Sequence, residues 1–187
     1  MIRTSVGYAG GSSSNPTYHN LDGHSETIQI DYDPTRITYE ELLAVFWDSH
    51  SPTVRSWSRQ YMSIVFYHNE EQRALAVKSK QAEEQKLGRT IVTEIIPFSE
   101  FYLAEDYHQK YYLTYEPGLL KELRTIYPAI EDFISSTAVA RVNGYVGGYG
   151  TLETLNKEVD SLGLSEAARI RLLGIAGRGL VAGCPVP

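Results

Sequence analysis

The chain contains one thiol, Cys184, which lies in the Gly-rich stretch at residues 177–187. A thiolate is a strong nucleophile and a redox-active group. With a single cysteine no disulfide can form within the chain, so dithiol chemistry would need a second thiol from elsewhere. An isolated cysteine near a terminus is equally well explained as an inert, exposed thiol.

The five histidines could suggest a metal site, but their spacing does not favour one. They are His19, His24, His50, His68 and His108. No pair has the short separation that places two imidazoles on one metal ion, and no second cysteine is present to complete a ligand set. The sequence therefore predicts no metal and no other cofactor.

Tyrosine is abundant, with 14 residues, and several lie beside Gly, His, Asp or Glu. The simplest interpretation of any one of them is a half-buried ring whose hydroxyl stays in water. A tyrosine becomes a candidate for function only when it belongs to a wider motif.

Eight short motifs follow one another in a consistent order. They are VGYAGG at 6–11, NPTY at 15–18, GHSE at 23–26, HSPT at 50–53, QYMS at 60–63, FYH at 66–68, VTEI at 92–95 and AEDYHQ at 104–109. None is specific alone. Together, over about residues 4–113, they resemble the peptide methionine sulfoxide reductase A family. The resemblance implies thiol-dependent reduction of methionine S-sulfoxide, free or in proteins, as a repair of oxidative damage.

That family carries its nucleophilic cysteine in a Gly-Cys-Phe-Trp-Gly type motif, one strand and one helix before the VGYAGG loop. Here Met1 stands five residues before Val6. We therefore expect that the segment with the nucleophile and the aromatic pocket for the sulfoxide methyl group is missing. A mis-set start, an alternative transcript and a degenerate paralogue would each explain this, and the exact chain could be inactive.

The resemblance also implies roles for three residues. Glu26 of GHSE matches the acid that protonates the sulfoxide oxygen, and this chemistry calls for a carboxyl in a partly buried apolar pocket. A solvated residue at the start of a strand is the alternative. Tyr18 and Tyr61 match two tyrosines that donate hydrogen bonds to the same oxygen, and neutral phenols do so without adding a charge.

Three further positions carry weaker implications. Ser56 stands where the family places an Asp that helps to hold the substrate, which puts substrate orientation in doubt. His108 is interpreted as a hydrogen-bonding residue beside the substrate pocket, and Glu105 and Asp106 share that interpretation. Cys184 matches the setting of a resolving thiol, which would attack a sulfenic acid and pass a disulfide to thioredoxin.

The elements that must position these residues can be predicted from local patterns. Thr38 with Glu41 has the spacing of a capping box, Asn69 with Gln72 opens a second helix, and Gly88 ends it. We expect strands at residues 4–8, 27–32, 63–67 and 91–96 and helices at residues 39–49 and 69–87. The order predicts an α+β, two-layer, ferredoxin-like sandwich, a mixed sheet with helices on one face, which lacks its first strand and helix.

Beyond residue 100 the chain becomes aromatic and polar, and we expect it to wrap the first part more than to form a second core. A short helix opens at Pro117, and two more are predicted at residues 151–162 and 165–176. The predicted domains are a reductase-like core at residues 1–113 and a helical, Gly-rich extension at residues 114–187.

Charge and hydropathy restrict the partners. The net charge of -6 and the absence of a Lys or Arg run argue against nucleic acid. No apolar run is long enough to span a membrane, and residues 1–20 lack the plan of a signal peptide. We expect a cytoplasmic monomer, unless an organelle leader is missing.

Its partners would be oxidised proteins or free methionine sulfoxide, with thioredoxin, or dithiothreitol in vitro, as reductant. The alternative function is a non-catalytic sulfoxide-binding module.

Overall fold

The structure is a computed structural model that describes residues 2–178. Its contacts separate into two compact units. The first contains residues 6–105, and the second contains residues 2–5 together with the chain from Asp106 onward. The predicted domain boundary after residue 113 stays a prediction. No helix within the described residues is both long enough and apolar enough to cross a lipid bilayer.

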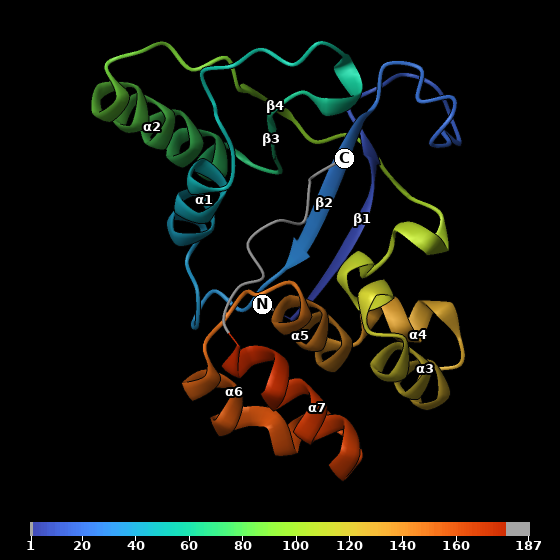
Figure 1. The fold of residues 1–187 in the computed structure, drawn as a ribbon. Coiled ribbons are helices and arrows are strands. Elements are labelled where there is room, and N and C mark those ends of the chain that lie inside the picture. The colour runs from blue at the N-terminus through green and yellow to red at the C-terminus, as the bar shows by residue number, and fades with distance from the viewer. Residues whose placement is uncertain (1, 179–187) are drawn as a thin grey trace. The chain divides into compact units, whose positions relative to one another are not determined.

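A three-stranded sheet carries parts of the VGYAGG and GHSE motifs (Figure 1). Strand β1 (Arg3–Ala9) lies between β2 (Ser25–Asp31) and β5 (Phe101–Leu103), and β1 pairs with β5 in the antiparallel sense. The pairing is close at Gly7, where an added Cβ would lie 2.2 Å from the carbonyl oxygen of Tyr102. A side chain at this position of the VGYAGG motif would therefore push the two strands apart.

Two further strands form a second sheet, so the single mixed sheet that the sequence predicts is not found. Strands β3 (Ile64–Tyr67) and β4 (Glu94–Pro97) pair in parallel, and within residues 2–178 neither pairs with the other sheet. The last predicted strand also begins three residues late. Ile91 N donates to Glu84 Oε1 and Val92 N donates to the carbonyl oxygen of Pro52. Because both amides bond to groups outside the sheet, the pairing of β4 with β3 begins after them.

Helices α1 (Tyr39–Asp48) and α2 (Glu70–Leu87) lie side by side and agree with the predicted helices. Both predicted caps are present: Thr38 forms a capping box with Glu41, and the Asn69 side chain accepts from the amide of Gln72. A small core packs the helices onto β3. It consists of Leu43, Trp47, Val65, Ala76 and Ile91. The α+β class is confirmed.

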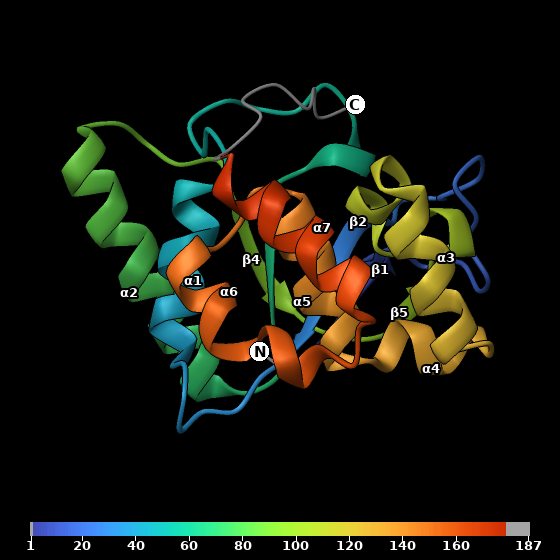
Figure 2. The same cartoon turned by 60° about the horizontal axis from the view of Figure 1, so that its bottom comes forward.

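The second unit is helical and has a core of its own, so the expectation of a wrapping segment is wrong. Helix α7 contacts α3, α5 and α6 (Figure 2). The elements are η2 (Asp106–His108), η3 (Tyr111–Tyr115), α3 (Pro117–Ile126), α4 (Ile130–Ser135), α5 (Thr137–Val146), α6 (Leu152–Glu158), η4 (Val159–Leu162) and α7 (Glu166–Gly177). Leu113, Leu123, Phe133, Leu155 and Leu172 are among the side chains that are completely buried there. Leu and Val side chains at helical spacing on these short helices form the core. The sequence prediction missed this core because the stretch that follows residue 100 is aromatic and polar.

A buried lysine ties residues 2–5 to the second unit. Lys110 is 5% exposed, and its ammonium group donates to the carbonyl oxygen and to the hydroxyl of Thr4. Burial lowers the pKa of Lys110 to about 8, because the low-dielectric interior disfavours the charged form.

This burial predicts a pH-dependent stability. Between about pH 8 and pH 10 the folded state has released the Lys110 proton while the unfolded state still holds it, so the free energy of unfolding rises with pH. Relative to a Lys110→Met variant, the wild-type chain should gain about 1–2 kcal/mol over this window, allowing for partial solvation. Urea unfolding of both proteins at several pH values measures the difference. Lys121→Met, which removes an exposed lysine of the same unit, serves as control, and a difference that is constant with pH would contradict the assignment.

Candidate functional site

Tyr18, Glu26 and Tyr61 come together in the first unit from a loop, a strand and a short 3-10 helix. Tyr18 follows β1, Glu26 lies on β2, and Tyr61 ends η1 (Arg59–Tyr61). A hydrogen bond with Tyr18, together with desolvation and the negative charge of Glu26, raises the pKa of Tyr61 to about 12. Tyr61 therefore keeps its proton throughout the neutral range and remains a hydrogen-bond donor.

One carboxylate holds the Tyr18 loop against β1. Glu105 Oε2 accepts from the Tyr8 hydroxyl at 2.6 Å, and Oε1 accepts from the backbone amide of Tyr18 at 3.1 Å. Charge-assisted hydrogen bonds of this kind are stronger than those between neutral groups. Glu105 thus has the structural hydrogen-bonding role that the sequence predicts for it.

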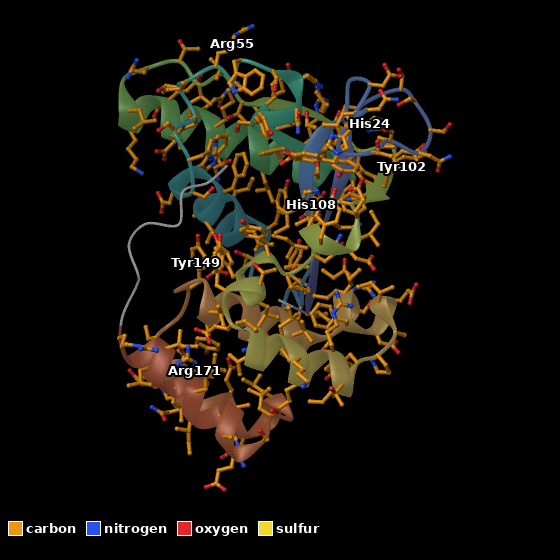
Figure 3. All side chains as sticks on the ribbon, turned by 45° about the vertical axis from the view of Figure 1, so that its right-hand side comes forward. His24, Arg55, Tyr102, His108, Tyr149 and Arg171 are labelled. Atoms are coloured by element: carbon orange, nitrogen blue, oxygen red, sulfur yellow. The ribbon has the colours of Figure 1, made fainter. Side chains whose placement is uncertain are left out.

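His24 shapes the loop that joins β1 to β2. It is 2% exposed, its Nδ1 accepts from the amide of Gly11 at 3.2 Å, and its Nε2 lies 3.0 Å from the carbonyl oxygen of Ser13. These partners place the ring proton on Nε2. The ring also meets the edge of Tyr102, with centroids 5.4 Å apart, and the two side chains lie beside each other in Figure 3. A Cβ on Gly11 would lie 2.2 Å from His24 Cδ2, so glycine is required here.

Ser25 connects Glu26 to the segment that carries Tyr61. The buried Ser25 hydroxyl donates to the carbonyl oxygen of Arg59 at 2.6 Å, which links the start of β2 to the start of η1. The Arg59 side chain in turn donates to Glu94 at 2.7 Å. The sequence interpretation missed His24 and Ser25 as positioning residues. Their place beside Glu26 in GHSE was the available signal.

Glu26 is exposed, and this corrects the expectation of a partly buried apolar pocket around it. Its Oε1 accepts from Gln60 Nε2 at 2.7 Å. Glu26 and Ile28 project from the same face of β2, and Ile28 is 57% exposed. Strand β2 is an edge strand of its sheet, and η1 contacts it beside Glu26.

Ser56 is engaged in the turn of its own loop. Its hydroxyl donates to the carbonyl oxygen of Ser58 at 3.0 Å and accepts from the Ser58 amide at 3.3 Å. The next residue, Trp57, is 85% exposed, and its ring centroid lies 5.5 Å from that of Tyr61. Arg55 is exposed in the same loop and is labelled in Figure 3. The role of Ser56 toward a substrate stays a prediction.

The sequence also points to His108 and Cys184. His108 belongs to η2 of the second unit, where its ring lies 4.2 Å from that of Tyr107, and its role in a substrate pocket stays a prediction. Cys184 lies outside the described residues. In the part of the chain that is described, no group of three His, Cys, Asp or Glu residues is arranged to hold a metal ion.

Residues 1–150 match the family model described as peptide methionine sulfoxide reductase. Residues 130–172 match a second model, the helical domain of selenoprotein methionine sulfoxide reductase A. The second match falls within the helical unit.

Individual relatives agree with these matches. The chain is 40% identical over 171 residues to a peptide methionine sulfoxide reductase of Drosophila melanogaster, covering 90% of this chain and 68% of the relative. It is 46% identical over 124 residues to the enzyme named MsrA of Methanosarcina acetivorans, covering 60% and 65%. The chain thus spans about two thirds of the length of these relatives.

Solved structures of similar proteins share the fold. The reduced form of Mxr1 from Saccharomyces cerevisiae matches with a TM-score of 0.56 and 32% identity, over 62% of this chain and 71% of that one. Methionine sulfoxide reductase A of Corynebacterium diphtheriae matches with a TM-score of 0.51 and 32% identity, over 61% and 63%.

Proposed function

Because the chain belongs to the peptide methionine sulfoxide reductase A family, we propose that Tyr18, Glu26 and Tyr61 bind the oxygen of a methionine S-sulfoxide during its thiol-dependent reduction. The observation that carries this proposal is the cluster itself. A hydrogen bond joins the two phenols, and Glu26 lies close enough for its charge to act on Tyr61. We therefore assign the sulfoxide oxygen to these three neighbouring side chains.

The proposed reaction transfers the sulfoxide oxygen to a thiol. A thiolate attacks the sulfoxide sulfur, and the S–O bond breaks as the oxygen is protonated and leaves as water. Water then attacks the sulfur of the former thiolate, which breaks the bond between the two sulfurs, releases the methionine thioether and leaves a sulfenic acid and a proton. Negative charge grows on the oxygen during the attack, and the hydroxyls of Tyr18 and Tyr61 would stabilise it. Glu26 would deliver the proton. A second thiol then reduces the sulfenic acid through a disulfide, with thioredoxin as the final reductant and Cys184 as the candidate resolving thiol.

A second candidate function is a binding module that holds oxidised methionine without reducing it. The observation that favours it is the cysteine content: Cys184 is the single thiol in these 187 residues. Both candidates require the sulfoxide oxygen to bind at the same three side chains. Binding and turnover must therefore be measured separately.

Binding of an N-acetylated, C-amidated methionine S-sulfoxide by residues 1–187 tests the site that both candidates share. Tyr18→Phe and Tyr61→Phe should each weaken binding by about 3–10-fold, because one donor is lost while the other remains. The double variant should lose more than either single variant. Titration followed by NMR chemical shifts or calorimetry measures the dissociation constants.

Two controls make this test specific. Tyr115→Phe removes a phenol that also bonds to another phenol, Tyr111, at 3.1 Å, but in the second unit, and it should leave affinity unchanged. The R-epimer of the same ligand should bind more weakly. Equal affinity for the two epimers, or full affinity in the double variant, would refute the proposed site.

A further inference from the structure

The most exposed large apolar side chain among the described residues is Trp57, with 85% of its surface accessible. The chain contains one other tryptophan, Trp47, which is 5% exposed and donates its indole N–H to Ser79 Oγ at 3.1 Å. Val54, three positions before Trp57, is 65% exposed. Two large apolar side chains in one short loop thus remain in water, where each costs free energy that a partner could recover.

The loop that carries Trp57 is held at several points. The carbonyl oxygen of Pro52 accepts from Val92 N at 2.9 Å, and the Ser56 hydroxyl closes the turn onto Ser58. The indole ring contacts the ring of Tyr61, and the two ring planes make an angle of 54°. Trp57 is therefore presented beside the phenol ring whose hydroxyl belongs to the proposed oxygen-binding cluster.

We propose that Trp57 contacts an apolar side chain adjacent to the oxidised methionine, so that the site favours methionine sulfoxide within a polypeptide over the free amino acid. This inference rests on the proposed function. A sulfoxide bound at Tyr61 brings the neighbouring residues of its own chain next to the indole. Free methionine sulfoxide has no such neighbours, and its carboxylate is a group that an indole face does not favour.

Tryptophan is suited to this task because it offers a large apolar face at a small entropic cost, since it has only two side-chain torsions. An apolar contact is also tolerant of sequence, which fits substrates that share only an oxidised methionine. The expected preference is for apolar residues, and particularly for Leu, Met or aromatic residues, on either side of the sulfoxide.

Two blocked tripeptides with a central methionine S-sulfoxide test the inference, one flanked by Leu and the other by Gly. The wild-type chain should bind the Leu peptide about tenfold more tightly, which corresponds to burial of part of an apolar side chain. Trp57→Ala should bring the ratio of the two dissociation constants close to one, and Trp57→Phe should keep most of it. Val45→Ala, which shortens another exposed side chain of the same unit, should leave the ratio unchanged.

Fluorescence locates the contact directly. Iodide should quench Trp57 and not the buried Trp47, and the Leu peptide should protect Trp57 from quenching. In Trp57→Phe the iodide-sensitive emission should be absent with and without peptide. Protection by the Gly peptide to the same extent would contradict the inference.

The outcomes separate this inference from the function on which it rests. If neither peptide binds, or if Tyr18→Phe with Tyr61→Phe has no effect, both fail. If both peptides bind equally and Trp57→Ala changes nothing, only the role of Trp57 fails. Trp57→Ala could instead change the oligomeric state in sedimentation and leave the ratio of the two dissociation constants unchanged. That result would assign the indole to contacts between copies of the chain and overturn the inference.

Discussion

The chain of 187 residues is expected to reduce a methionine S-sulfoxide substrate at no more than a trace rate with dithiothreitol as reductant. The reacting group is a thiolate, and no side chain other than Cys184 can supply one in this sequence. The phenols and the carboxylate of the cluster can polarise the sulfoxide, but they provide no electrons. Quantification of methionine released from the S-epimer, with thiol alone as blank, measures the rate.

A matched variant makes this result decisive. Cys184→Ser should change the trace rate little if the cysteine is not the nucleophile. If the wild-type chain shows robust turnover and Cys184→Ser abolishes it, the expectation is wrong and Cys184 is the nucleophile. Turnover that survives Cys184→Ser would assign the reaction to the added dithiol attacking a sulfoxide bound at the cluster.

Replacement of Glu26 by Gln is expected to slow sulfoxide reduction by about 10²–10⁴-fold in a fusion that places a segment with a Gly-Cys-Phe-Trp-Gly motif before residue 1. Glutamine keeps the size of the side chain and can still contact Gln60, but it cannot deliver a proton. Tyr18→Phe and Tyr61→Phe should have smaller effects, because each leaves the other donor in place. Single-turnover measurement of sulfenic acid formation isolates the reductive step from recycling.

The pH dependence of this effect distinguishes a proton donor from a structural residue. The loss caused by Glu26→Gln should shrink as the pH falls from about 8 to about 5.5, because bulk acid increasingly supplies the proton. A structural role would give a loss that does not change with pH and that follows the free energy of unfolding. A variant with the parent rate at neutral pH would remove Glu26 from the mechanism.

Features that depend on residues close together in the chain could be predicted from the sequence. The capping residues Thr38 and Asn69 predicted where α1 and α2 begin, because a cap and the amide that it binds lie within one turn. The order of eight motifs predicted the family, and the match over residues 1–150 confirms it. The candidate residues Tyr18, Glu26 and Tyr61 also followed from those motifs.

The contacts that hold these residues, and the exposure of their side chains, could be read only from the folded chain. The bonds from Ser25 to Arg59 and from Glu105 to Tyr8 and Tyr18 join segments that are far apart in the chain, and no local pattern encodes such pairs. The exposure of Glu26 and the division of the strands into two sheets depend on which elements pack together. The core of the helical unit depends on the same choice, because short amphipathic helices bury their apolar faces only against one another.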